Sequence, residues 1–201
     1  AVAFANLAAA RELAATPELL GIANEAGRAL LIAGDVAAAT RWHDMAQTLA
    51  ASGNAQGLKV SQQLWPLLRL AHGAGSWPED SSQLTAWFDR LAPEARQSNG
   101  LLMLTLLQAL GFETPPAAWG KIKLTPLFVS RETPAAPLLQ LLQDAGRRGR
   151  LGETVLLSLI CLNGRLDDGF LLSQTLGALM RVGLADEARA LAVEAAMRAG
   201  I

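Results

Sequence analysis

Glycines divide the last third of the chain into short segments rich in leucine and alanine. Four consecutive segments each end in glycine: PLLQLLQDAG, ETVLLSLICLNG, DDGFLLSQTLGALMRVG and ADEARALAVEAAMRAG. Glycine directly after a helix is a frequent stop signal, because it adopts the left-handed backbone conformation without strain. Connections this short leave neighbouring helices antiparallel. The spacing therefore predicts a stack of helical hairpins over residues 135–201.

The amino-acid composition favours helix over strand. Hydrophobic residues make up 51% of the 201 residues and charged residues 17%, a balance that is not that of a disordered chain. Leucine and alanine dominate, β-branched residues are sparse and tyrosine is absent, as is typical of helical proteins. We predict an all-α protein of about ten to eleven helices. The length suits one domain or a short repeat array, and we predict a single helical-repeat domain over 1–201.

The predicted domain has three parts. Residues 1–111 carry the cap, proline and glycine signals of N-terminal hairpins, although Pro66 inside the helix expected over 55–72 predicts a kink or a break there. Residues 112–134 contain several prolines and β-branched residues, which predict an irregular connection. The C-terminal hairpins follow from residue 135.

Two apolar runs are prominent, LLMLTLLQAL at 101–110 and VLLSLICL at 155–162. Both are shorter than the roughly 18 to 20 residues that a membrane-spanning helix needs, so we predict no transmembrane segment. Both are predicted to be fully buried core helices. The second run contains Cys161, the single cysteine of the chain, which we expect to be a small buried hydrophobic side chain.

The stretch AGRALLIAGDVAAATRWHDMA places two glycines seven residues apart, Gly27 and Gly34. Gly34 is expected to end one helix, with Asp35 as the cap of the next. Gly27 lies inside a helix, where glycine costs about 1 kcal/mol relative to alanine, so we expect another helix to cross closely there. Ala39 and Ala46 give the following helix a matching face of small residues.

This stretch resembles a tetratricopeptide repeat, a family that pairs two antiparallel helices. The residues that carry the resemblance are Gly27, Leu30, Gly34, Asp35, Ala39 and Ala46, whereas the aromatic position of the repeat falls on His43, beside Trp42. A second unit aligns on it through Ala178, Leu179, Gly183, Ala188 and Ala195. The two units cover about 70 residues, and the middle of the chain does not keep the family's period. An α-solenoid of antiparallel hairpins with an irregular middle is therefore predicted, with an irregular helical bundle as the alternative.

The resemblance implies that the first helix of each hairpin lines a concave, ligand-binding surface. The corresponding positions are Asn24 and Arg28, with Arg181 on the matching helix near the end of the chain. Asn24 and Arg28 are four residues apart and share one helix face, so the pair could hold a peptide backbone or a carboxylate. The alternative is an ordinary solvated stripe.

Tryptophans supply a further candidate contact. Trp42, Trp65 and Trp87 lie among apolar neighbours on expected helices and are predicted to be core residues, whereas Trp77 and Trp119 lie in or beside connections that contain proline and glycine. An exposed tryptophan in a loop is a frequent contact residue at protein interfaces. We therefore take Trp77 as a candidate partner-binding residue, with burial of its indole as the alternative.

The chain lacks the residue patterns that metal binding or nucleophilic catalysis requires. Its two histidines, His43 and His72, are far apart in the sequence, and no P-loop, G-x-S-x-G or G-x-G-x-x-G motif occurs. We predict no catalytic residue, no metal site and no cofactor. The alternative, an accessory helical domain of an enzyme, would use His43, Asp44 and Glu25.

The chain is not strongly basic, because it has 17 basic and 18 acidic residues. The densest basic cluster, Arg147, Arg148 and Arg150, lies on a glycine-rich turn and is predicted to be solvated, so we expect no nucleic-acid partner. A single cysteine favours the cytoplasm without assigning it. A periplasmic or secreted chain whose targeting segment has been removed fits as well.

These observations favour a non-catalytic scaffold or adaptor that binds a protein or peptide partner in a solenoid groove. Self-association is the remaining alternative. It would use an apolar face on the last helix, formed by Leu191, Val193, Met197 and Ile201.

Overall fold

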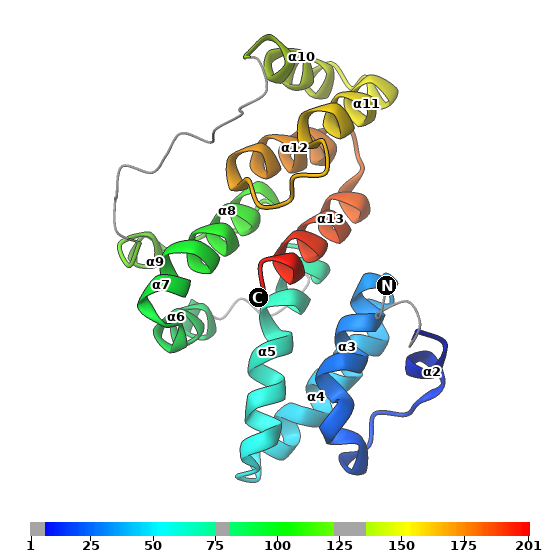
Figure 1. Ribbon diagram of the computed structural model, residues 1–201, viewed down its shortest axis with the longest axis vertical. Coiled ribbons are helices and arrows are strands. Elements are labelled where there is room, and N and C mark those ends of the chain that lie inside the picture. The colour runs from blue at the N-terminus through cyan, green and yellow to red at the C-terminus, as the bar shows by residue number, and fades with distance from the viewer. Residues whose placement is uncertain (1–6, 75–80, 123–135) are drawn as a thin grey trace. The chain divides into compact units, whose positions relative to one another are not determined.

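A computed structural model describes residues 7–74, 81–122 and 136–201, and this part of the chain is helical without any strand (Figure 1). Its helices number 11 when the continuous stretch from Pro93 to Ala109 is taken as one. The predictions of an all-α fold and of the helix count are confirmed. None of the described helices is both long and apolar enough to cross a membrane.

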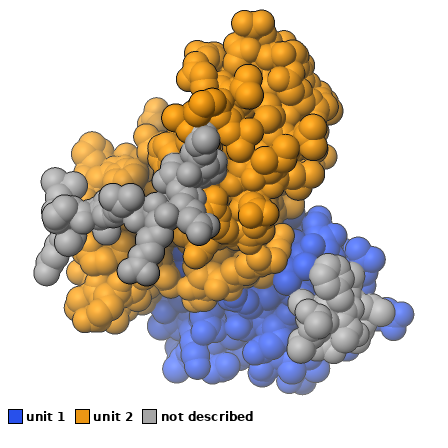
Figure 2. Space-filling model, turned by 45° about the horizontal axis from the view of Figure 1, so that its top comes forward, with its two compact units in different colours: residues 1–72, 201 blue, residues 73–200 orange. Residues whose placement is uncertain are grey.

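The chain divides into two compact units, coloured separately in Figure 2. Unit 1 comprises Ala1–His72 and Ile201, and unit 2 comprises Gly73–Gly200. The irregular connection expected over 112–134 stays a prediction, because residues 123–135 lie outside the described part of the chain.

Unit 1 is built on three helices that pack against one another. After α2 (Leu7–Glu12) and a 3-10 helix (Pro17–Ile22) come α3 (Ala23–Ile32), α4 (Val36–Ala51) and α5 (Ala55–His72). Helix α4 contacts both neighbours, and α3 also contacts α5. The three helices therefore all contact one another.

The turn between α3 and α4 follows directly from the sequence Gly34-Asp35. Gly34 has a left-handed φ of 76° and its N–H donates to the carbonyl of Leu31 at 3.1 Å, while the N–H of Asp35 donates to Leu30 at 2.9 Å. These two bonds close the helix end in the pattern that glycine favours. The Asp35 carboxylate accepts from the N–H of Ala38 at 3.0 Å, which confirms the predicted cap.

The aligned hairpin near the end of the chain closes in the same way. Gly183 has a φ of 85°, its N–H donates to Met180 at 3.2 Å, and the N–H of Leu184 donates to Leu179 at 3.0 Å. The two turns that carry the sequence alignment therefore share one local geometry, which reflects the same glycine position after an apolar helix.

Glycines mark the close approaches inside unit 1. A Cβ on Gly27 would lie 2.8 Å from a methyl carbon of Leu64, so the predicted close crossing is present. Its partner, however, is α5 rather than the following helix α4. The fully buried Ala46 of α4 instead meets Gly57 of α5, where a Cβ would lie 2.7 Å from the Ala46 carbonyl oxygen.

Helix α5 runs through Pro66 without a break. Of the two outcomes that the sequence predicts at Pro66, a kink or a break, the break is therefore wrong. Proline removes a backbone donor and crowds the preceding turn. On both sides of Pro66, however, the side chains of Leu64, Trp65, Leu67 and Leu68 are buried. Burial of this face stabilises the continuous helix by more than the proline destabilises it.

Unit 2 contains α6 (Ser81–Arg90), α7 (Pro93–Ala95), a π-turn (Arg96–Gly100), α8 (Leu101–Ala109), α9 (Pro116–Trp119), α10 (Ala136–Arg147), α11 (Leu151–Leu162), α12 (Gly169–Arg181) and α13 (Ala185–Arg198). Helices α10, α11 and α12 contact one another, and α13 packs on α12. Helix α8 packs on α12 and α13, which lie far along the sequence. The described part of unit 2 thus departs from a stack in sequence order.

The π-turn at the start of α8 holds the end of α6. The Arg96 guanidinium donates to the carbonyl oxygens of Phe88 and Leu91, each at 3.1 Å. Gly100 comes so close to the ring of Phe88 that a Cβ would lie 2.7 Å from it. One arginine and one glycine therefore fix the junction of two helices.

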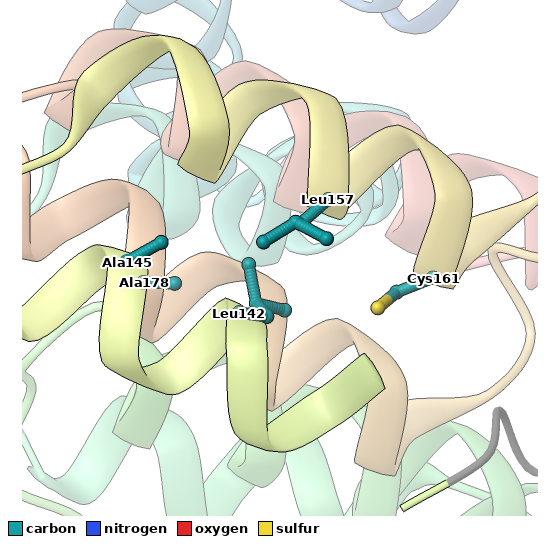
Figure 3. Close-up of a cluster of buried hydrophobic side chains, with 5 residues drawn as sticks. All are labelled: Leu142, Ala145, Leu157, Cys161 and Ala178. Carbon is teal, nitrogen blue, oxygen red and sulfur yellow. The ribbon is translucent and has the colours of Figure 1, made fainter. Parts of the chain in front are cut away.

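A buried cluster joins α10, α11 and α12 (Figure 3). It consists of Leu142, Ala145, Leu157, Cys161 and Ala178, and Leu157 and Cys161 point from α11 towards Leu142 in Figure 3. Cys161 is fully buried, as predicted, and burial raises the pKa of its thiol.

The two apolar runs have different environments. Helix α8 is a core helix whose leucines and Met103 are mostly buried, as predicted. Helix α11 is not fully buried, because Leu151, Leu156, Leu159 and Ile160 are exposed. The prediction for this run is wrong, since α11 packs on α10 and α12 through only part of its circumference.

Candidate functional site

The candidate site of unit 1 lies on one face of α3, where Arg28 contacts main chain. Its guanidinium donates a hydrogen bond to the backbone carbonyl oxygen of Ile201 at 2.9 Å. Burial lowers the pKa of Arg28, and the nearby Glu25 carboxylate partly opposes this shift. A guanidinium keeps its charge in proteins and carries five N–H donors, so Arg28 can bind a further acceptor.

Asn24 lies one turn before Arg28 on the same face of α3. Its side-chain oxygen is buried and accepts no hydrogen bond from the described residues. A buried acceptor without a partner costs about 1–3 kcal/mol and is uncommon in folded proteins. Asn24 therefore carries a buried acceptor without a described partner, one helical turn from Arg28.

Asn24 and Arg28 carry the two kinds of group that a peptide bond pairs with, although the Asn24 oxygen is buried in the described structure. An acceptor suits an amide N–H and a charged donor suits a carbonyl or a carboxylate. Sequence reasoning identified the pair but not Ile201, because 173 residues separate it from Arg28 and no local signal connects them.

The other two candidate contact residues are not part of this arrangement. Arg181 is exposed on α12 in unit 2, where it donates to the side-chain oxygen of Gln143 on α10 at 3.0 Å. Gln143 in turn donates to Gln174, so Arg181 belongs to a polar network across α10 and α12. Trp77 lies outside the described residues.

The remaining tryptophans have structural environments. Trp42, Trp65 and Trp87 are buried, as predicted. Trp119 is half-buried, and its indole N–H donates to the hydroxyl of Thr114 at 2.9 Å. This bond ties the last residue of α9 to the segment before the helix.

A second polar group in unit 1 contains both histidines. His43 is buried and its Nδ1 lies 3.3 Å from a carboxylate oxygen of Asp44. The Nε2 of His72 lies 2.9 Å from the hydroxyl of Thr40. That hydroxyl donates to the carbonyl of Val36 at 2.8 Å, so it accepts from the imidazole N–H of His72.

The surroundings of both imidazoles lower their pKa values. Burial lowers the pKa of His43, opposed by Asp44. Burial also lowers the pKa of His72, which Asp44 raises and His43 lowers. The sequence missed that His72 interacts with His43 and Asp44, because no residue spacing relates α4 to the end of α5.

We expect the free energy of unfolding to fall as pH drops below about 6.5, the ordinary histidine pKa. Below that value the unfolded chain binds more protons than the folded one, because the folded pKa of His43 is lowered. The slope contributed by His43 can reach about 1.4 kcal/mol per pH unit. Urea unfolding of the wild type and His43→Gln between about pH 5.5 and 7.5 measures it. An unchanged slope in His43→Gln would contradict the expectation.

Other charged residues have structural partners. Arg148 and Arg150 pair with Asp144 at 3.0 and 2.7 Å, and Arg150 also pairs with Glu153 at 2.7 Å. The Asp168 carboxylate accepts from the N–H of Leu171 and caps α12.

No group of three or more histidine, cysteine or carboxylate side chains suited to a metal ion occurs within 7–74, 81–122 or 136–201.

Comparison of the chain with protein-family models, curated proteins and solved structures finds no match. The tetratricopeptide resemblance therefore stays an interpretation of the two aligned hairpins. A proposal for function has to rest on the geometry of the chain itself.

Proposed function

We propose that this chain is a non-catalytic scaffold or adaptor that binds an extended segment of a protein or peptide partner. The binding face is that of α3 with Asn24 and Arg28. One observation carries the proposal: Arg28 already donates to a main-chain carbonyl at 2.9 Å, beside a buried acceptor without a partner. A face that binds backbone in this way suits peptide recognition, because main-chain bonds supply affinity for many sequences.

The helix packing supports this proposal. Helices α3, α4 and α5 contact one another in sequence order, as do α10, α11 and α12. Stacked hairpins of this kind form solenoids with a concave surface in tetratricopeptide proteins. The solenoid groove is part of the proposal, and unit 1 supplies its first peptide-binding helix.

Arg28→Glu is expected to weaken peptide binding by at least about tenfold, because a charge-assisted bond is worth about 1.5–3 kcal/mol and a carboxylate repels a carbonyl oxygen. Peptides are first selected from a random display library on the wild-type chain. Their affinities for the wild type and the variants are then measured by fluorescence polarisation. Arg41→Glu is the matched control, since Arg41 is exposed on the neighbouring helix α4.

Two further variants sharpen the test. Asn24→Ala removes the acceptor without a partner, and we expect it to lower the affinity of the same peptides for the chain. Trp77→Ala tests the other candidate contact residue that the sequence offers. Peptides that lose affinity in Trp77→Ala but not in Arg28→Glu would move the binding site away from α3. Selection that enriches no peptide would overturn the proposal.

A further inference from the structure

Helix α11 exposes an apolar face that its neighbours in unit 2 do not cover. Leu156 is 58% exposed, Leu159 67%, Ile160 49% and Leu151 50%. By helical spacing, Leu156 and Leu159 lie on the side opposite Leu157 and Cys161, whereas Leu151 and Ile160 lie at the two borders of this side. Leu157 and Cys161 point into the cluster of Figure 3. Within the helix this face contains a single charged side chain, Glu153, which pairs with Arg150.

The exposed apolar face of α11 is large enough to be an interaction site. Four half-exposed or more exposed aliphatic side chains on one short helix form a patch of a few hundred Å², the size at which patches on monomers mark interaction sites. Of the apolar face that the sequence predicted for self-association, Val193 on α13 and Ile201 beyond its end are buried, and Leu191 and Met197 are half-buried. In the described part of unit 2, α11 carries four of the exposed large apolar side chains, and the others are Leu141 on α10 and Phe170 on α12.

We propose that this face binds a second copy of the chain, with the two α11 helices antiparallel about a two-fold axis. A two-fold interface joins a surface to itself, so the surface has to be self-complementary. Leu156 and Leu159 lie near the middle of the 12-residue helix. About a two-fold axis there, each meets the other in the partner copy, and apolar side chains cover apolar side chains.

The charges at the two ends of α11 fit this arrangement. Beside its N-terminus lie Arg147, Arg148 and Arg150 against the carboxylates of Asp144 and Glu153, an excess of positive charge. Beyond its C-terminus lie Asp167 and Asp168 against Arg165, an excess of negative charge. Antiparallel pairing brings the basic end of each copy next to the acidic end of the other. The helix dipoles then add to the attraction.

Parallel or unrelated partners lack this match. A parallel pair would place arginines against arginines and aspartates against aspartates.

The area that one helix face buries is below the roughly 800 Å² per partner of a stable dimer, so we expect a dissociation constant in the micromolar range. The dimer is independent of the peptide-binding face on α3.

Sedimentation equilibrium from about 1 to about 500 µM is expected to show a reversible dimer. Leu159→Glu is expected to leave a monomer across this range, because it places two carboxylates at the centre of the interface. Leu58→Glu is the matched control: Leu58 on α5 is 49% exposed, and its replacement is expected to leave the dimer intact. Far-UV circular dichroism checks that both variants stay folded.

A charge swap tests the antiparallel arrangement. Arg147 and Asp167 are both exposed. Arg147→Glu or Asp167→Arg alone is expected to weaken the dimer by about tenfold, because each change is repeated by the two-fold axis. The double variant is expected to restore the wild-type constant.

Three results would overturn the proposal. The first is a wild-type chain that is monomeric at all these concentrations, including one whose α11 face binds lipid vesicles or another protein instead. The second is a dimer that Leu159→Glu leaves unchanged. The third is a double charge variant that is as weak as the single ones, which would exclude the antiparallel arrangement.

Discussion

Replacement of Gly57 by alanine is expected to lower the free energy of unfolding by about 2–3 kcal/mol. The added Cβ would lie 2.7 Å from the carbonyl oxygen of Ala46, 2.9 Å from the backbone nitrogen of Ala50 and 2.9 Å from the Cβ of Leu49. Two of these atoms are backbone of α4, so relief requires α4 and α5 to move apart. The higher helix propensity of alanine offsets at most about 1 kcal/mol of this strain.

Urea unfolding followed by circular dichroism measures the change, and Gly177→Ala is its control. Gly177 lies inside α12, where an added Cβ meets only a guanidinium nitrogen of Arg181 at 3.9 Å. Alanine is therefore expected to stabilise that helix by about 0.5–1 kcal/mol. Equal effects of the two substitutions would show that the contact between α4 and α5 is not as close as the structure has it.

Leu142→Ala is expected to cost about 2–5 kcal/mol, because it opens a cavity at the centre of the cluster in Figure 3. Leu142 is fully buried among Ala145, Leu157, Cys161 and Ala178. The backbones of α10 and α12 already approach closely, since a Cβ on Gly146 would lie 3.2 Å from Ala178. The helices therefore cannot move closer to fill the space.

The adjacent residue supplies a matched control for this substitution. Leu141 is 49% exposed on the same helix, so Leu141→Ala removes the same atoms from a largely solvated position. It is expected to change the free energy of unfolding by less than about 1 kcal/mol. Thermal and urea unfolding of both variants compare the two. A Leu142→Ala variant as stable as Leu141→Ala would contradict the burial of this cluster.

The local structure of the chain was predictable because its signals are local. Glycine after an apolar segment closes α3 and α12 through bonds within a few residues, and Asp35 caps α4 through the N–H of Ala38. These interactions depend on residues that are neighbours in the sequence. These helix ends and this cap could therefore be predicted from residue types alone, whereas the continuation of α5 through Pro66 could not.

The pairing of helices could not be predicted in the same way. Gly27 inside a helix predicts a close contact with another helix. No neighbouring residue in the sequence indicates that Leu64 of α5 makes this contact. The run VLLSLICL is apolar enough for complete burial, yet whether α11 is covered depends on how many helices surround it. The candidate site has the same limit: Asn24 and Arg28 share a face by helical spacing, whereas the carbonyl of Ile201 reaches Arg28 only in the folded chain.

The contact between α8 and α12 has a consequence for the order in which unit 2 folds. Helix α8 ends at Ala109 and α12 begins at Gly169, so this contact closes a much longer loop than the short turns that join α10 to α11 or α12 to α13. The entropy lost on closing a loop grows with its length, and distant contacts slow folding. The hairpins of unit 2 can therefore form early from their own turns, whereas α8 has to find a surface that exists only once α12 is in place.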